Sequence, residues 1–311
     1  AASKSNTYWE AQRPDTLTHK EQATYSMLDS VGKKNNFDKK FNMLNAFQDG
    51  NLRLQYVSVQ LYNVVKFNRQ EGFRLGMGLE TNSDLFKKYK IGGFAGYGLR
   101  DQLWKYGGFF EWKMYYPKNI KLLLNYSMSY EESGGTKYYQ GTYWGNNENY
   151  RNYTIDNFDL VTRKEIAFTS RIRKYINLEL TAFDAEKNPT NNYQFVNMHS
   201  GEPVVEDQFT FSGIKAALRF SYKEKIVESL DKYYWINTGH PTIWLQVTQG
   251  FNGFIDGDYT YTKYESKFNY SFPTRSWGIT TLTLEGGWVN NSIPATDLFT
   301  GRSSYSPLGL F

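Results

Sequence analysis

The sequence contains no cysteine among its 311 residues. This absence excludes a disulfide scaffold, a thiol nucleophile and a zinc site built on thiolates, and it leaves no cysteine for N-terminal lipidation. Long apolar runs are missing as well. A membrane-spanning helix needs about 20 consecutive apolar residues, whereas the mean hydropathy of this chain is −0.64. The sequence therefore predicts no membrane-spanning helix.

Histidine is scarce, with three residues in the chain: His19, His199 and His240. No two of them share the spacing of metal ligands, and no order of serine, histidine and aspartate indicates a triad. His199 is the strongest candidate, because Ser200 and the acidic residues between 202 and 207 would suit an acid–base cluster or a weak metal site. We nevertheless predict no catalytic residue, no metal site and no cofactor, and thus a protein that is not an enzyme.

Dense basic runs are also absent. The net charge of +5 is spread along the chain, so nucleic acid is not an expected partner. The first residues, Ala1-Ala2-Ser3-Lys4, do not form a signal peptide, which indicates a mature form or a fragment of a longer precursor.

Aromatic residues, by contrast, are in excess: 26 tyrosines, 22 phenylalanines and 8 tryptophans. In an outer-membrane β-barrel only every second residue faces lipid, so the average hydropathy stays polar. Tyrosine and tryptophan gather at the membrane interfaces of such proteins. A secreted β-sandwich or a carbohydrate-binding sheet would fit the same composition, so composition alone leaves these classes open.

The first 50 residues differ from the rest. Thr18 and Glu21 form the pattern of a capping box, and they predict a helix that Gly32 would end. A second short helix is expected over residues 37–47, where Phe37, Phe41, Leu44 and Phe47 share one face. We interpret residues 1–50 as a periplasmic or plug-like lead-in that packs on the rim of a barrel, with an independent functional domain as the alternative.

From about residue 54 onward, apolar and polar residues alternate with a period of two. Phe73, Leu75 and Met77, for example, alternate with Arg74, Gly76 and Gly78. The pattern predicts about ten strands, most of roughly 9–13 residues, which is the length that a tilted membrane-spanning strand needs; soluble strands more often have about 5–6. Strand length therefore favours an all-β fold over residues 51–311, an antiparallel transmembrane β-barrel of the outer-membrane type.

Charged side chains fall on the polar side of this alternation. A lysine or arginine at the lipid midplane costs roughly 2–4 kcal/mol, so these residues are expected to face the lumen. The predicted lumen-facing residues are Arg74, Glu80, Glu111, Lys113, Lys121, Arg171, Glu179, Lys215, Arg219, Glu265, Lys267 and Glu285. Because both signs are present, we expect a lumen crossed by salt bridges and nearly closed, whereas one sign would indicate an ion-selective pore. The glycines near residues 76–78 and 92–98 are expected to leave inner space for a plug or for the lead-in helices.

Predicted connections alternate between short and long, as is typical of outer-membrane barrels. Tight links are expected at residues 116–119 and 173–175, facing the periplasm. Long polar connections are expected at residues 131–156, 186–208 and 223–240, facing the outside.

Three segments resemble a family of Bacteroidota outer-membrane β-barrel proteins of unknown function. Residues 8–14 (YWEAQRP), followed by Leu17-Thr18, are similar to the family's "WEENRP…LT" linker. Residues 68–76 (NRQEGFRLG) are similar to its "N-x-x-EG-x-R-L-G" first strand. The next hairpin matches in Gly96-Tyr97-Gly98 and in residues 104–107 (WKYG). The resemblance covers most of residues 8–115 and rests on pattern only thereafter.

The resemblance implies an outer-membrane location in a Gram-negative bacterium and about fourteen strands, so that strands beyond Phe311 would be needed. The carboxypeptidase-regulatory-like domain that often precedes the family's barrel is absent here, and residues 1–50 would be the linker that follows it. The family is distantly similar to the outer-membrane insertase and secretion-pore superfamily, whose "R-G-F/Y" loop is only echoed by residues 301–305 (GRSSY).

Three functions remain open at this point. The first is a non-enzymatic component of an envelope assembly or transport complex, in contact with outer-membrane lipids and lipopolysaccharide and with other outer-membrane or periplasmic proteins. The second is a passive or gated pore. The third is a surface adhesin or glycan binder. Its contacts would be aromatic residues of the first long loop: Tyr138, Tyr139, Tyr143, Trp144, Tyr150 and Tyr153.

Overall fold

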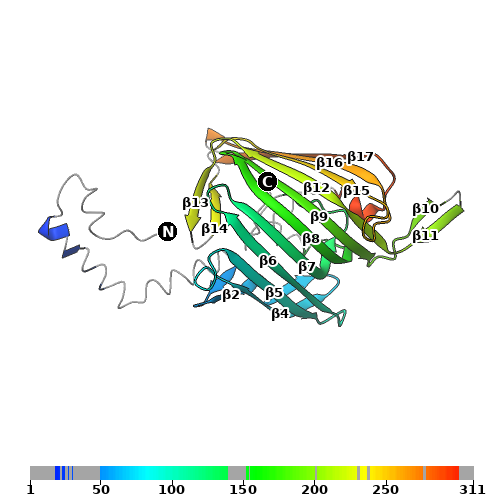
Figure 1. Ribbon diagram of the computed structural model, residues 1–311, viewed down its shortest axis with the longest axis horizontal. Coiled ribbons are helices and arrows are strands. Elements are labelled where there is room, and N and C mark those ends of the chain that lie inside the picture. Colours follow the sequence, from blue (N-terminus) through cyan, green and yellow to red (C-terminus); the bar gives the residue numbers. More distant parts are fainter. Residues whose placement is uncertain are drawn as a thin grey trace.

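One large antiparallel sheet dominates the fold. The computed structural model describes residues 18–21, 23–24, 27, 30, 50–138, 152–153, 155–199, 202–229, 232–236, 239–275 and 278–300. Its main sheet has 13 strands in the order β1-β2-β4-β5-β6-β7-β8-β9-β12-β15-β16-β17, with β3 paired to β4 (Figure 1). The chain is therefore an all-β antiparallel protein.

Ten of these strands are long. They are β4 (Gly72–Thr81), β5 (Tyr89–Gly98), β6 (Trp104–Tyr115), β7 (Ile120–Glu132), β8 (Phe158–Arg173), β9 (Ile176–Pro189), β12 (Phe209–Ser221), β15 (Thr242–Gly250), β16 (Tyr261–Pro273) and β17 (Ile279–Val289). The alternation thus predicted both the number and the approximate length of the long strands.

Short elements complete the sheet at its first edge. These are β1 (Asn51–Arg53), β2 (Val57–Gln60), the 3₁₀ turn η1 (Leu61–Asn63) and β3 (Val65–Asn68). β2 pairs with one half of β4 and β3 with the other half, so η1 interrupts what is otherwise one strand. A second 3₁₀ turn, η3 (Ala295–Asp297), follows β17.

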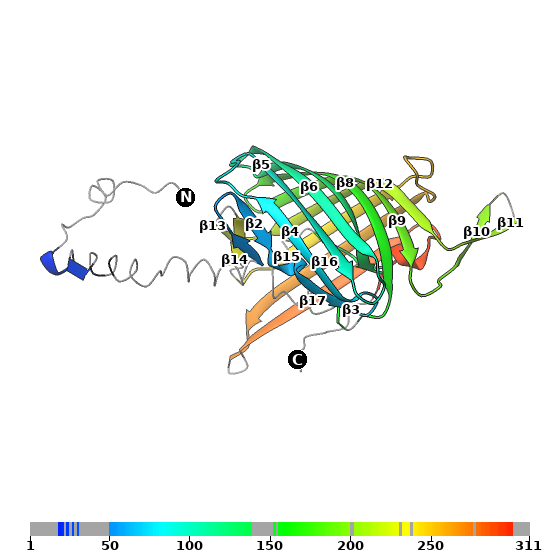
Figure 2. The same cartoon turned by 90° about the horizontal axis from the view of Figure 1, so that it is seen from below.

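The sheet curves strongly around one of its faces (Figure 2). Arg74 in β4 donates a hydrogen bond of 3.1 Å to Ser129 in β7, although β5 and β6 lie between them. In a flat sheet these strands would be about 14 Å apart, because neighbouring strands are about 4.8 Å apart, and the two side chains could not meet. Among the described residues no pairing joins β1 to β17, so the sheet is curled but open.

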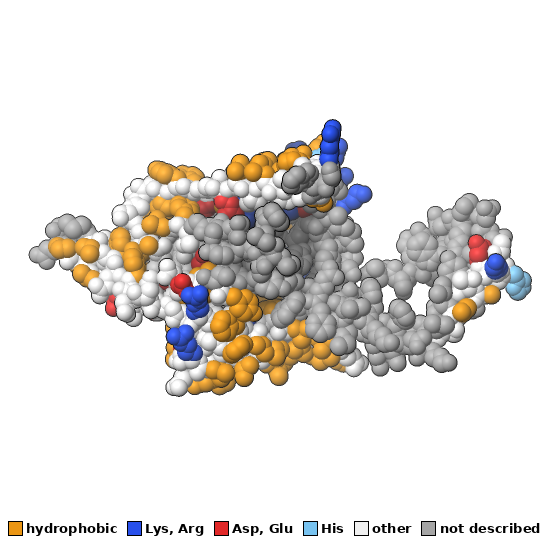
Figure 3. Space-filling view, turned by 180° about the vertical axis from the view of Figure 1, so that it is seen from behind, with side chains coloured by type: hydrophobic (Ala, Val, Ile, Leu, Met, Phe, Trp, Pro, Cys, Tyr) orange, Lys and Arg blue, Asp and Glu red, His pale blue; other side chains and the backbone are white. Residues whose placement is uncertain are grey.

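The two faces of the sheet differ in chemistry. We call the inner face, which carries Arg74, Glu111, Glu179, Lys215 and Glu265, the polar face, and the opposite one the apolar face. Large hydrophobic side chains of the apolar face are exposed along the whole sheet, for example Leu75, Ile166, Leu245 and Leu284 at 50%, 54%, 50% and 57%. Figure 3 shows hydrophobic side chains along the outer margins of the sheet, with charged ones both at the margins and in the visible part of the hollow between them.

Connections between strands leave the sheet at two ends. The turn end carries residues 82–88, 116–119, 174–175, 222–241 and 274–278, and the loop end carries residues 99–103, 133–157, 190–208, 251–260 and the segment after β17. The tight links expected at residues 116–119 and 173–175 are present. The connection at residues 223–240, expected with the long loops, lies instead at the turn end, so the predicted alternation of short and long connections was wrong there.

Two of the expected polar loops contain strand hairpins. Within residues 186–208, β9 continues to Pro189, and β10 (Phe195–His199) pairs with β11 (Glu202–Glu206). Within residues 223–240, β13 (Lys225–Ser229) pairs with β14 (Lys232–Ile236). Their valine, isoleucine and tyrosine residues favour strands, but the segments are too short for the alternation to stand out.

The lead-in is described at a few positions only. Thr18 and Glu21 exchange the hydrogen bonds of a capping box: the Thr18 backbone N–H donates to the Glu21 carboxylate at 2.8 Å, and the Glu21 N–H donates to the Thr18 hydroxyl at 3.4 Å. Residues 19–21, 23–24, 27 and 30 are helical, as the capping pattern predicted. The second helix expected at residues 37–47 lies outside the described residues. Among the described residues, no helix is long and apolar enough to cross a membrane.

Candidate functional site

All twelve charged residues predicted to face inward lie on the polar face. Residues directly opposite each other on antiparallel strands share a face. Lys113 lies opposite Lys121, Lys121 opposite Thr169, and Thr169 opposite Glu179. The register continues from β9 through β12 and β15 to Glu265 and Lys267 on β16 and Glu285 on β17. At the other end of the sheet, Arg74 and Glu80 share this face through β5.

Opposite charges are paired along this face. Lys121 lies 3.3 Å from Glu111, Lys215 lies 3.6 Å from Glu179, and Lys267 lies 2.8 Å from Glu285. In the same way, Glu80 contacts Lys90 at 2.7 Å, and Arg219 contacts Glu224 at 2.5 Å. Four of these five ion pairs cross-link neighbouring strands on the polar face, and the fifth ties Arg219 to Glu224 in the connection after β12.

A buried network accounts for the first-strand motif at residues 68–76. The Asn68 side chain contacts Glu71, and the Glu71 carboxylate lies 3.7 Å from Arg74 and 3.6 Å from Lys105. Lys105 also pairs with Asp101. Arg74 and Lys105 are 1% and 0% exposed. A buried cation is tolerated only when it is paired and hydrogen-bonded, so Glu71 of the motif, together with Asp101, makes these cations possible inside the sheet.

The glycines of β4 and β5 make room for this network. A Cβ atom at Gly96 would lie 3.1 Å from the Arg74 side chain, and one at Gly98 would collide with Asp101. A Cβ atom at Gly78 would collide with Gln60 and with Asn63 of η1. The inner space that the glycines were expected to leave for a plug or the lead-in helices is thus filled by the sheet's own side chains and by η1.

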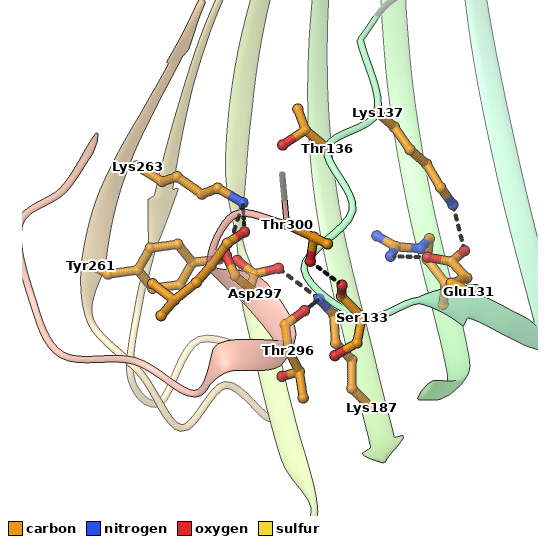
Figure 4. A network of polar contacts seen from close by, with 12 residues as sticks. Glu131, Ser133, Thr136, Lys137, Lys187, Tyr261, Lys263, Thr296, Asp297 and Thr300 are labelled. Carbon is orange, nitrogen blue, oxygen red and sulfur yellow. Dashed lines mark hydrogen bonds and ion pairs between the residues drawn. The ribbon is translucent and has the colours of Figure 1, made fainter. Parts of the chain in front are cut away.

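A second network closes the polar face at the loop end (Figure 4). It is made by two segments that we call the latch: residues 133–138, which follow β7, and residues 293–300, which follow β17. The segments hold each other through backbone hydrogen bonds of 3.0 Å from Gly134 N–H to Thr296 O and from Thr300 N–H to Gly134 O. The Thr300 hydroxyl also donates to Ser133 O at 2.6 Å.

Side chains of the polar face hold the latch in place. Lys187 on β9 donates to Thr296 O at 2.8 Å and to the Asp297 carboxylate at 2.7 Å. Lys263 on β16 donates to Asp297 O at 2.8 Å, and the Tyr261 hydroxyl donates to the Asp297 carboxylate at 3.0 Å. Asp297 is thus the common partner of three side chains from two strands.

The first latch segment reaches β16 as well. The Thr136 hydroxyl donates to Glu265 at 2.8 Å, and the Tyr138 hydroxyl donates to Ser266 O at 3.0 Å. Lys137 pairs with Glu131 at 2.6 Å, and Glu131 pairs with Arg163 of β8 at 2.7 Å. Since β7 and β16 are five positions apart in the sheet, the latch crosses the hollow of the curled sheet.

Hydrophobic packing also holds the second latch segment, residues 293–300, in place. Ile293 is 3% exposed and belongs to a buried cluster with Phe209, Phe211, Tyr259 and Tyr261. Gly134 has a φ of +67°, and a Cβ atom there would lie 2.6 Å from the Thr300 hydroxyl, so glycine is required at this position.

Asp297 is ionised in this setting. Burial raises the pKa of its carboxyl group, but the ammonium groups of Lys187 and Lys263 outweigh this effect and hold the pKa below the usual range. The hydrogen bonds from Lys187 and Tyr261 act in the same direction. The latch is therefore fastened by charge-assisted hydrogen bonds, which are stronger than neutral ones.

A small cavity of about 90 Å³ lies beneath the latch. Its walls mix both signs of charge, with Glu131, Arg163, Lys215 and Glu265 among the lining residues. The lining oxygen Oε1 of Gln246 is buried and has no hydrogen-bond partner among the described residues. A volume of this kind with polar walls suits ordered water.

Several residues of this network were absent from the predicted site. Glu131 and Lys187 had been assigned to long loops, and Arg163 of β8 was not among the predicted lumen-facing residues. Extending the period of two from Glu179 through residues 181, 183 and 185 would have placed Lys187 on the polar face. Asp297 carries no comparable signal, because it belongs to a 3₁₀ turn outside the strand pattern.

The other predicted candidates, the loop aromatic residues and the histidines, take little part in these two networks. Tyr138 lies on the polar face as described, and Tyr153 stacks on Phe67 with ring centroids 5.5 Å apart. Tyr139, Tyr143, Trp144 and Tyr150 lie outside the described residues. His199 lies in β10, and His240 packs its ring against Tyr222. Within the described ranges no group of histidine and acidic residues could hold a metal ion.

The fold and the site together define a class: an all-β protein whose large antiparallel sheet has one ion-paired face and one mostly apolar face, the latter interrupted by the Lys164–Asp184 ion pair on β8 and β9. Comparison with known protein families gives no matching family. Comparison with curated proteins gives no matching protein either.

Proposed function

We propose that the chain is an outer-membrane β-barrel protein that acts without catalysis, as a component of an envelope assembly or transport complex. The observation that carries this proposal is the exposed apolar face, which extends over all ten long strands. A monomeric soluble protein rarely exposes a contiguous apolar patch of more than a few hundred Å². Lipid would cover this face at no cost, and the polar face would then line an interior.

The pairing of backbone N–H and C=O groups also supports a membrane location. In hydrocarbon every N–H and C=O group must be paired, so β-sheet can span a membrane only as part of a closed structure. The inner strands satisfy this condition, because β8 pairs along nearly its whole length with β7 and β9. Among the described residues the edge strands β1 and β17 do not, and in a membrane the sheet would have to close on itself, gain further strands or pair with a partner. Pairing with a partner would make the chain part of a complex.

The polar face favours a closed interior over a wide pore. Ion pairs cross-link its strands, the η1 turn and the first-strand network fill one part, and the latch crosses another. Mixed charges held in pairs do not form the single-sign ring that selects ions in a channel. A role in holding or assembling envelope components fits such a filled interior better than free diffusion.

Fractionation and affinity purification would test the proposal. We expect a tagged chain to sediment with outer membranes, to require detergent for extraction, and to co-purify in mild detergent with an envelope protein in fixed proportion. A chain that stays folded and soluble without detergent would overturn the membrane assignment. A monodisperse chain without partners, from the same mild extract, would overturn the assignment to a complex.

A further inference from the structure

We propose that the latch is a releasable gate, which in its fastened state closes the polar interior at the loop end and in its released state admits small hydrophilic solutes. This inference rests on the proposed function, because it requires the polar face to line an interior. It concerns two segments that are far apart in sequence, residues 133–138 and 293–300, and that meet across the hollow of the sheet (Figure 4).

The latch is held by different kinds of bond than the strands of the sheet. Strands of the sheet are joined by long ladders, for example 14 residue pairs between β8 and β9. The latch segments share two backbone hydrogen bonds with each other, and most of their remaining bonds come from side chains. A segment held by side-chain hydrogen bonds and by the packing of Ile293 and Leu298 opens at a lower free energy than a strand held by a full ladder.

Asp297 is the residue on which the attachment depends most. Its carboxylate binds Lys187 and Tyr261, and its backbone oxygen binds Lys263. Without this carboxylate, the Lys187 ammonium group would lose its ion-pair partner in the latch. The fastened state would then lose its strongest contacts, whereas a released latch would leave both lysines accessible to water.

Release of the latch would connect an existing cavity to the outside. The cavity of about 90 Å³ lies between the latch and the polar face, and Thr136, Lys137 and Asp297 form part of its wall. Removal of the latch would open this wall toward the loop end. The exposed lining would be hydrophilic and of mixed charge, which suits water, small ions and small polar solutes.

Single-channel recording in planar bilayers tests the gate. The probe is potassium chloride, and the variants are Asp297→Ala and, as a matched control, Asp84→Asn. Asp84 also forms an ion pair, with Arg53 at 3.0 Å, but it lies at the turn end. We expect wild type and Asp84→Asn to show rare openings. Asp297→Ala removes the hydrogen bonds from Lys187 and Tyr261 to the carboxylate. It should open at least roughly tenfold more often, the change that follows from the loss of one charge-assisted hydrogen bond.

A crosslink provides the reverse test. The chain has no cysteine, so a Thr136→Cys and Glu265→Cys pair added to Asp297→Ala would carry the only thiols. A short, reductant-cleavable thiol crosslinker should return the openings to the wild-type frequency, and reductant should restore them. If Asp297→Ala does not fold, the Thr136→Val and Thr300→Val double variant removes two latch hydrogen bonds and leaves every charge in place.

The outcomes separate the two proposals. Folded Asp297→Ala protein that inserts into lipid but opens no more often than wild type overturns the gate and leaves the proposed function standing. Equal openings in Asp84→Asn also overturn it, because they would reflect a general loss of charge pairing. Failure of folded wild-type protein to associate with lipid vesicles overturns the proposed function itself.

Discussion

At the scale of single residues, the polar face is built from glycines as much as from charges. Buried arginine and lysine side chains need volume, and in β4 and β5 glycines on the same face provide it. Gly76 is the position closest to the backbone of a neighbouring strand, because a Cβ atom there would lie 2.4 Å from Ala95 O and 2.7 Å from the Gly96 Cα atom. Backbone atoms of a neighbouring strand cannot move aside as a flexible side chain can.

Gly76→Ala should therefore destabilise the protein by about 1–3 kcal/mol, the usual cost of overpacking. Gly108, on the apolar face of β6, serves as the control, since a Cβ atom there would meet only Gly92 O at 3.5 Å. Gly108→Ala should be neutral or slightly stabilising, because it reduces the freedom of the unfolded chain. Unfolding by urea in detergent micelles measures both variants. Equal stability of the two would show that β4 and β5 tolerate side chains on the polar face.

At the scale of elements, substitutions on the two faces of β17 would distinguish a membrane protein from a soluble one. Leu284, at the middle of β17, is 57% exposed on the apolar face, and Thr283 is exposed on the polar face. In water, lysine at either position would be solvated, so neither substitution should matter. In lipid, position 284 would face hydrocarbon and position 283 would not.

Leu284→Lys should thus weaken insertion into lipid vesicles by roughly 2–4 kcal/mol, and Thr283→Lys should have little effect. Folding into vesicles of varied lipid content, followed by the shift in electrophoretic mobility between heated and unheated samples, measures the difference. A similar effect of both lysines would contradict the assignment of the apolar face to lipid.

The same elements show what a sequence can predict. A period of two is a local property, so it predicted ten long strands and placed Arg74, Lys121, Lys215 and Glu285 on one face. The latch is not local, because it joins residues 133–138 to residues 293–300 through backbone groups that any sequence possesses. The η1 turn escaped prediction for a related reason: its place inside the sheet follows from the glycines of β4, which lie more than ten residues away in the chain.

At the scale of the whole molecule, the open edge is the feature that a membrane would not tolerate. β17 forms a ladder of eleven residue pairs with β16, but within the described residues its outer side pairs with nothing. Unpaired backbone groups cost several kcal/mol each in hydrocarbon. A membrane therefore demands either that the sheet close or that another strand join it, while a micelle can admit water at the edge.

Hydrogen exchange of the backbone amides would show which of these occurs. In the purified chain in detergent, we expect slow exchange in β8 and β9, which are paired on both sides, and fast exchange at those amides of β17 that point away from β16. In the complex extracted from native membranes, the outward amides of β17 should become as slow as those of β8, because a partner strand would occupy them. Slow exchange of β17 already in the purified chain would mean that the sheet closes on itself, and the open edge would then give no support to a partner.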